Sequence, residues 1–176
     1  MFSKPSRIIP IILIFLILLG TGIIVYTISH ETRSALRESV QKNLMSVAGI
    51  AASEIDGDAF ARLQPGDETS PAFFRIRDLL RQIKNTNPDI HYIYTMKKSG
   101  DTVVFVVDAD YGSSADAAPI GQKYPEAEPE LLAGFSGPSV DAEFTTDQWG
   151  SVLSGFSPIR DRSGAVVGIV GVDMDS

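Results

Sequence analysis

The sequence predicts an α+β protein in which an N-terminal transmembrane helix continues into a long helix that packs on an antiparallel β-sheet. Three observations indicate this fold class. Residues 8–28 are apolar, residues 29–55 carry an apolar seam at helical spacing, and residues 91–108 have the pattern of a β-hairpin. At 176 residues, the chain is long enough for one globular domain besides the N-terminal segment.

The charge balance and the absence of cysteine argue against several classes of function. The chain has 22 acidic and 15 basic residues, so it would repel a phosphate backbone, and we expect no nucleic acid partner. It has no Cys, which removes disulfides, thiolate metal ligands and a Cys nucleophile. Of its two histidines, His30 follows the apolar segment and His91 lies in a predicted strand. We therefore predict that the protein is not an enzyme and has no catalytic residues, metal site or cofactor.

The apolar segment of residues 8–28 predicts a membrane span, because about 20 helical residues match the thickness of the hydrocarbon core. Lys4 and Arg7 precede it, and basic residues favour the cytoplasmic side. We expect residues 1–7 in the cytoplasm, a single pass through the cell membrane, and the rest of the chain outside the cytoplasm. A cleaved signal peptide is the alternative. The apolar run is longer than a usual signal core, and no small-x-small cleavage site follows closely, so an uncleaved anchor is favoured.

Residues 29–55 predict a stalk helix. Their apolar residues recur at steps of four and three, which is typical of one helix face. These residues are Leu36, Val40, Leu44, Val47 and Ala51. Two interpretations stay open: the seam packs on the sheet of the same chain, or it also pairs with a second copy and forms a homodimer.

Residues 56–176 predict the extracytoplasmic domain. Asp56-Gly57-Asp58 ends the stalk helix, and Ser70-Pro71 begins a second helix with proline at its first position. The β-hairpin follows, and a long polar connection without periodicity comes after Asp108. Connections of this kind in compact domains are often functional. The last predicted strand, residues 166–172, is apolar on both faces and therefore interior.

The hairpin has a predicted register. With Ser99-Gly100 at the centre of the turn, Tyr94 would lie opposite Phe105, and Asp108 would belong to the opposite face. Both faces are largely apolar, so each must be covered. We expect helices on one face of the sheet and a pocket or loops on the other.

Two carboxylates and a group of aromatic residues suggest a binding site. Asp108 and Asp173 each end an apolar strand, where a carboxylate needs a partner: a backbone N–H, an arginine or the cationic group of a ligand. Tyrosine and tryptophan rings would line a pocket with apolar walls and polar tips, although core packing is the alternative for each ring. The predicted ligand-binding residues are Tyr92, Tyr94, Asp108, Asp110, Tyr124, Trp149 and Asp173.

Several segments share a pattern with a known family: residues 92–96, 105–108, 149–150 and 154–159, and Gly164 followed by residues 168–173. Together they resemble the Cache superfamily, the extracytoplasmic PAS-like sensor domains of membrane receptors. The resemblance covers roughly residues 29–173. It implies a PAS-like antiparallel sheet with the long helix on one face and a small-molecule site on the other.

The resemblance also implies something about the ligand. The position of Asp173 resembles the carboxylate that binds the amino group of the ligand in amino-acid-sensing members. The Arg-x-Trp element that binds the ligand carboxylate in those members is absent, and few basic residues lie in the C-terminal half. These departures disfavour amino acids and dicarboxylates, and we expect a small neutral or cationic ligand.

A receptor of this kind would relay binding as a shift of the last strand against the stalk helix. The resemblance implies an output module of the histidine kinase, chemoreceptor or cyclic-nucleotide type in the cytoplasm, and this module is not present in the chain. A pilin-like structural subunit without a ligand is the alternative, since pilins also join an apolar N-terminal helix to a sheet.

Overall fold

The computed structural model describes residues 8–125, 127–147 and 150–175. The chain divides into two compact units, Met1–Val40 and Gln41–Ser176. Helix α1 (Ile8–Glu54) is continuous over both predicted helical segments. The other helices are α2 (Gly57–Ala61), α3 (Pro71–Thr86) and α4 (Pro129–Gly134). The strands are β1 (Tyr92–Ser99), β2 (Thr102–Asp108), β3 (Lys123–Tyr124), β4 (Ser139–Val140), β5 (Thr145–Asp147), β6 (Gly150–Arg160) and β7 (Val166–Asp175).

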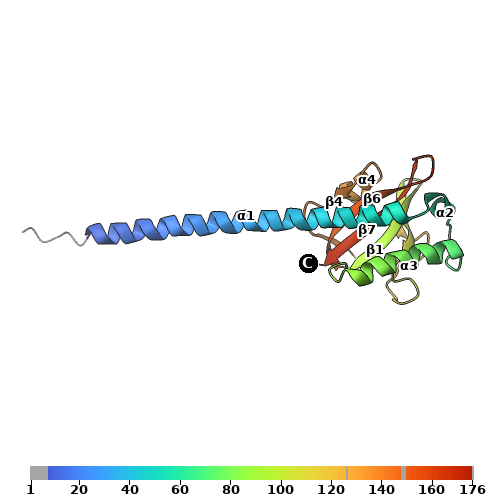
Figure 1. Cartoon of the computed structure of the whole chain (residues 1–176), viewed down its shortest axis with the longest axis horizontal. Coiled ribbons are helices and arrows are strands. Elements are labelled where there is room, and N and C mark those ends of the chain that lie inside the picture. The colour runs from blue at the N-terminus through green and yellow to red at the C-terminus, as the bar shows by residue number, and fades with distance from the viewer. Residues whose placement is uncertain (1–7, 126, 148–149, 176) are drawn as a thin grey trace, which may run out of the picture. The chain divides into compact units, whose positions relative to one another are not determined.

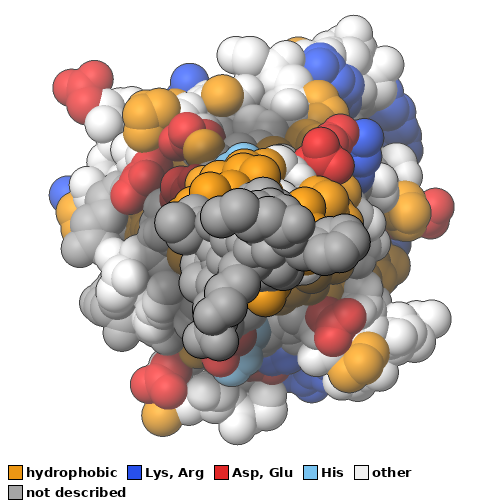
Figure 2. Space-filling model, turned by 90° about the vertical axis from the view of Figure 1, so that its left-hand side faces the viewer, with side chains coloured by type: hydrophobic (Ala, Val, Ile, Leu, Met, Phe, Trp, Pro, Cys, Tyr) orange, Lys and Arg blue, Asp and Glu red, His pale blue; other side chains and the backbone are white. Residues whose placement is uncertain are grey.

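In the first unit, helix α1 is apolar and exposed. The large apolar side chains between Ile12 and Ile28 are exposed by 50% at Leu19 up to 70% at Tyr26. Figure 2 shows hydrophobic side chains gathered around this helix. The helix is long and apolar enough to cross a membrane.

The second unit contains one antiparallel sheet. Its strand order is β3-β2-β1-β7-β6-β4, and β5 also pairs with β6. Strand β7 is interior, as its apolar pattern predicts, because it lies between β1 and β6. Strand β6 pairs with β7 from Val152 to Arg160. The predicted α+β fold class, a long helix packed on an antiparallel sheet, is confirmed.

The end of α1 and the helices α2 and α3 cover one face of this sheet (Figure 1). Helix α1 contacts β6 so closely at Gly155 that a Cβ there would lie 2.7 Å from Leu44 Cβ. Leu44 and Ala51 of the seam are buried, as is the neighbouring Ala48, so this part of the seam packs within its own chain. Pairing of the stalk with a second copy stays a prediction.

The predicted register of the hairpin is wrong. Met96 pairs with Phe105, because β1 ends at Ser99 and β2 begins at Thr102, which places the centre of the turn at Gly100-Asp101. Tyr94 pairs with Asp108, because one extra residue on β2, Val106, forms a β-bulge beyond the Met96–Phe105 pair. The Thr95 hydroxyl lies at this irregularity and accepts a hydrogen bond from Val107 N at 2.9 Å. The bulge reverses the alternation of β2, so Asp108 lies on the same face as Tyr94 and not on the opposite one.

The second face of the sheet has a core that continues beyond the strands. Side chains of β1, β2, β6 and β7 pack against Ala118 and Leu131. Ala118 belongs to the connection formed by residues 109–122, and Leu131 belongs to α4. The core residues are Met96, Val103, Phe105, Ala118, Leu131, Phe156 and Ile169. The 109–122 connection and α4 therefore cover this face, as expected for loops above a pocket.

Candidate functional site

A cavity lies between the second face of the sheet and the 109–122 connection. We call it the first cavity. It contains six of the seven predicted site residues. Its lining is Tyr92, Tyr94, Phe105, Asp108, Asp110, Ser114, Asp116, Ala117, Ala118, Tyr124, Val152 and Asp173. The seventh predicted residue, Trp149, lies outside the described residues.

Tyr94 and Asp173 form the central polar pair of the cavity. They lie on adjacent strands, β1 and β7, and the Tyr94 hydroxyl donates a hydrogen bond to Asp173 Oδ1 at 3.1 Å. Asp173 is only 6% exposed. The pKa of Tyr94 is raised well above its usual range, mainly by burial and also by the negative charge of Asp173. Tyr94 therefore remains a neutral donor at physiological pH.

The rings of the cavity form a continuous wall. Tyr94 packs edge to face against Phe105, with ring centroids 5.3 Å apart, and Phe105 packs in the same way against Tyr124 at 5.8 Å. Such edge-to-face pairs are favourable because the positive ring edge meets the negative ring face. The wall is thus apolar, while the Tyr94 hydroxyl points toward a carboxylate.

Asp108 has a structural role besides lining the cavity. Its Oδ1 accepts a hydrogen bond from Asp110 N at 2.8 Å, and its Oδ2 accepts one from Ala118 N at 3.0 Å. Burial raises the pKa of Asp108, and these two backbone donors oppose the rise. Asp108 therefore matches the alternative in which a strand-end aspartate binds backbone N–H groups, and it fixes both ends of the 109–118 segment.

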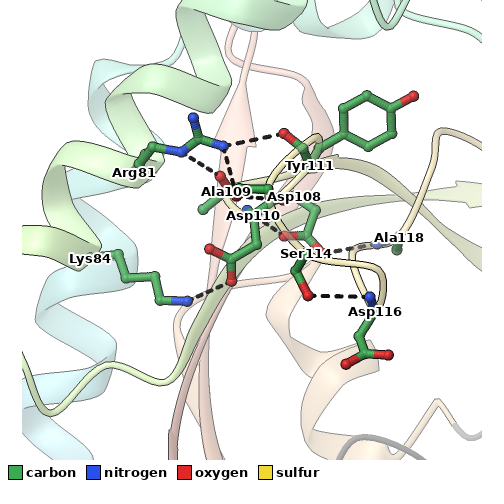
Figure 3. Close-up of polar contacts among 10 residues, drawn as sticks. Arg81, Lys84, Asp108, Ala109, Asp110, Tyr111, Ser114, Asp116 and Ala118 are labelled. Atoms are coloured by element: carbon green, nitrogen blue, oxygen red, sulfur yellow. Dashed lines mark hydrogen bonds and ion pairs between the residues drawn. The ribbon is translucent and has the colours of Figure 1, made fainter.

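Helix α3 holds the same segment from the other side (Figure 3). Arg81 Nε donates to the Ala109 carbonyl at 2.9 Å, and Arg81 Nη2 donates to the Tyr111 carbonyl at 3.2 Å. Lys84 Nζ forms an ion pair with Asp110 Oδ2 at 2.5 Å. The prediction that basic residues are scarce near the site was based only on the C-terminal half of the sequence. It missed these two cations, which come from α3.

A second cavity adjoins the first and contains a residue that the sequence did not indicate. Both cavities are lined by Tyr94, Tyr124 and Asp173. The second cavity is also lined by Asp141, which is 4% exposed and accepts a hydrogen bond from Ser154 N at 2.9 Å. Asp141 lies in a polar stretch without periodicity, so the sequence predicts it on the surface with the other acids.

The first cavity offers groups that can bind a small polar molecule. The first cavity has a volume of about 30 Å³, which is room for about two water molecules. Among the described residues, no group of three or more His, Cys, Asp or Glu side chains could hold a metal ion. The cavity offers carboxylates, a neutral hydroxyl donor and aromatic walls, which are suitable partners for a small cation or a small polar molecule.

Comparison with solved structures identifies the fold. No family model matches the sequence, and no curated protein matches it. The sensor domain of the histidine kinase DctB from V. cholerae is 14% identical with a TM-score of 0.63, over 92% of this chain and 57% of that one. An extracellular ligand-binding receptor from Desulfohalobium retbaense is 18% identical with a TM-score of 0.55, over 82% of this chain and 24% of that one.

A third match is the periplasmic sensory domain of the Campylobacter jejuni chemoreceptor Tlp1. It is 9% identical with a TM-score of 0.54, over 82% of this chain and 57% of that one. The chain thus spans between 24% and 57% of the length of the structures named here. The three matches are a sensor domain, an extracellular receptor and a periplasmic sensory domain, and at such low identity they establish the fold alone. The resemblance predicted from the sequence is therefore confirmed at the level of the fold: the chain has the Cache-like, PAS-like fold of these domains.

Proposed function

We propose that the protein is the membrane-anchored, extracytoplasmic sensor of a signal-transduction receptor, and that it binds a small neutral or cationic molecule in the first cavity. The observation that carries this proposal is the Tyr94–Asp173 pair, a nearly buried carboxylate and a neutral hydroxyl at the centre of an aromatic cavity. The sensor fold supports the role, and the apolar helix supports the anchoring. The matches to sensor domains give no support to the pilin-like alternative.

The fold offers a direct route for relaying such binding. Asp173 lies on β7, and β7 pairs with β6 through nine residue pairs from Val152 to Arg160. Strand β6 in turn contacts α1 at Gly155. A ligand that changes the position of Asp173 would therefore bias the contact between the sheet and α1, which is a population shift between two packings.

Binding of small probe molecules to the full chain in detergent micelles tests the proposal. Methylamine, ethylamine, tetramethylammonium and acetamide are suitable probes, because the cavity is small and acidic. At least one probe should raise the melting temperature in proportion to the logarithm of its concentration. Asp173→Asn and Tyr94→Phe should each lower the apparent affinity for the probe at least 10-fold, and the rise in melting temperature should shrink accordingly.

Asp101→Asn is the matched control, because Asp101 is an exposed acid in the turn between β1 and β2. This variant should bind the probes like the original protein. If no probe stabilises the protein, or if the three variants respond alike, the cavity is not the ligand site.

A further inference from the structure

Asp141 is a buried acid that belongs to the sheet through its backbone. It follows β4, its N–H donates to the Ser154 carbonyl at 2.9 Å, and its Oδ2 accepts from Ser154 N at 2.9 Å. Its side chain lies in the second cavity and is 4% exposed. Aspartate is rarely buried to this extent without a cationic partner, because removal from water disfavours the charged form.

Among the described residues, those that line the second cavity with Asp141 include no Lys or Arg. Glu128 precedes α4, Glu130 lies within it, and both repel the Asp141 carboxylate. Asp173 on β7 lines the same cavity, as do the hydroxyls of Tyr94 on β1 and Tyr124 on β3. Helix α1 contributes the neutral Gln41, and β6 contributes Ser154.

These surroundings shift the titration of Asp141 into the physiological range. Burial raises the pKa of Asp141 from 3.8 to about 6; the hydrogen bonds from Ser154 oppose the rise, and the charges of Glu130 and Glu128 add to it. The folded protein therefore binds this proton more tightly than the unfolded chain. The contribution of Asp141 to stability is greatest below the unfolded pKa of 3.8 and falls as the pH rises through the folded pKa of about 6.

The same residue contacts the helix that carries the apolar segment. Gln41 Nε2 on α1 donates a hydrogen bond to the backbone carbonyl of Asp141 at 2.8 Å. The neighbouring strand residue Gly155 lies against Leu44 of the same helix. One residue thus has its carboxyl group in a cavity and its carbonyl group on α1, so a change at the carboxyl can move the contact with the helix.

We propose that Asp141 is a proton-binding site that couples the acidity of the surrounding medium to the contact between α1 and the sheet. In the charged state, Asp141 is repelled by Glu128 and Glu130. When the carboxylate takes up a proton from solvent, this repulsion ends, and the carboxyl group can donate a hydrogen bond within the cavity. Strand β4 then moves relative to β6, and the Gln41 contact moves with it. This response to protons is separate from the proposed ligand binding, because the proton binds in the second cavity and no organic molecule is needed.

Two measurements on the full chain in detergent micelles test the inference. The first is the ¹³C chemical shift of the Asp141 carboxyl carbon between pH 4 and pH 8, which should titrate with a midpoint near pH 6. The second is the distance between spin labels at Asn43→Cys on α1 and Ser136→Cys after α4, both at exposed positions. The chain has no native Cys, so only these two positions are labelled. The distance distribution should change with the same midpoint.

Variants separate the proton site from its coupling. Asp141→Asn should abolish the pH dependence of the spin-label distance, while Asp101→Asn should leave it unchanged. Gln41→Ala should leave the carboxyl titration intact and uncouple the distance from it. Glu130→Gln should lower the midpoint, because it removes a negative neighbour; Glu130 is only partly buried, so this variant tests the site even if Asp141→Asn fails to fold.

Other results would overturn the inference. A midpoint below pH 5, or one that Glu130→Gln does not lower, excludes Asp141 as a proton site in this pH range. A normal titration with an invariant distance excludes the coupling to α1. Failure of every organic probe to bind would contradict the proposed ligand site and leave the pH response unaffected, so the two proposals fail independently.

Discussion

Tyr94 can reach Asp173 because residue 171 is a glycine. Gly171 pairs with Tyr94 across β1 and β7, and the Tyr94 ring lies directly over it. A Cβ at position 171 would lie 2.4 Å from Tyr94 Cε2 and 2.7 Å from Cζ. These separations are far below a van der Waals contact, and the main chain of an interior strand cannot retreat from the ring.

Gly171→Ala should therefore displace the Tyr94 ring and break its hydrogen bond to Asp173. We expect the free energy of unfolding to fall by about 1–3 kcal/mol from overpacking, and any probe affinity of the first cavity to fall with it. Chemical denaturation measures the first effect. Gly137→Ala is the control, because a Cβ at Gly137 meets no atom within 4 Å. Equal free energies of unfolding for the two variants would show that the Tyr94 ring adjusts without loss of stability.

At the residue scale, the sequence predicts the first cavity better than the second. The predicted acids and strand tyrosines can be recognised because their neighbours are apolar, and Tyr92, Tyr94, Asp108 and Asp173 line one cavity. Asp108 ends β2 as predicted, whereas Asp173 lies within β7, because pairing with β6 continues the strand to Asp175. Asp141 could not be recognised, since its burial depends on pairing with Ser154, a residue 13 positions later. Polar residues outside periodic segments carry no local sign of burial.

At the scale of elements, α3 supports the sheet and also holds the segment that closes the first cavity. Arg81 and Lys84 together contact Ala109, Asp110 and Tyr111. These contacts come from one face of the helix, since the two cations are three residues apart. The 109–118 segment is thus ordered by α3 from one side and by Asp108 from the other.

Arg81→Ala should loosen this segment without unfolding the sheet. Loss of the hydrogen bonds from a charged group, about 1.5 kcal/mol, corresponds to roughly a 10-fold rise in amide hydrogen exchange across residues 109–118. Exchange in β6 and β7 should not change. Arg75→Ala is the charge-matched control, because Arg75 lies on an exposed position of α3. A uniform rise across the whole domain would instead indicate global destabilisation.

The elements themselves could be predicted only where their pattern is strong. The amphipathic helix after Ser70-Pro71 and the hairpin strands are present, and Ser70 Oγ accepts from Phe73 N as a helix cap. The register of the hairpin could not be predicted for two reasons: the turn is centred one residue later than expected, on Gly100-Asp101, and the bulge at Val106 lies within an uninterrupted run of β-branched and aromatic residues. The short strands β3, β4 and β5 also have no pattern of their own; β3 pairs with β2, and β4 and β5 pair with β6.

At the scale of the whole molecule, the fold class follows from a few global features: one apolar helix, one seam and one hairpin with two apolar faces. These features require a covered sheet outside the apolar segment, whatever the details of each strand. The orientation across a membrane is a separate question, since it depends on Lys4 and Arg7 and not on the fold.

Cysteine labelling of intact cells should decide this orientation. The chain has no native Cys, so Ser136→Cys in the sheet domain and Ser3→Cys in the N-terminal segment each create a single reactive site. A membrane-impermeant maleimide should label Ser136→Cys and not Ser3→Cys. Labelling of both after cell lysis is the control for reactivity. The reverse pattern in intact cells would contradict the predicted topology, and an N-terminus missing from the purified protein would indicate a cleaved signal peptide.

The small volume of the first cavity also limits how fast a larger molecule could bind. The cavity has room for about two water molecules, so a larger guest would require the 109–118 segment, which lines it, to move. The observed on-rate for such a guest would then level off at high concentration, at the rate of that opening. Its apparent affinity would also be lower than the affinity of the open state, because only a small fraction of the molecules is open at any time.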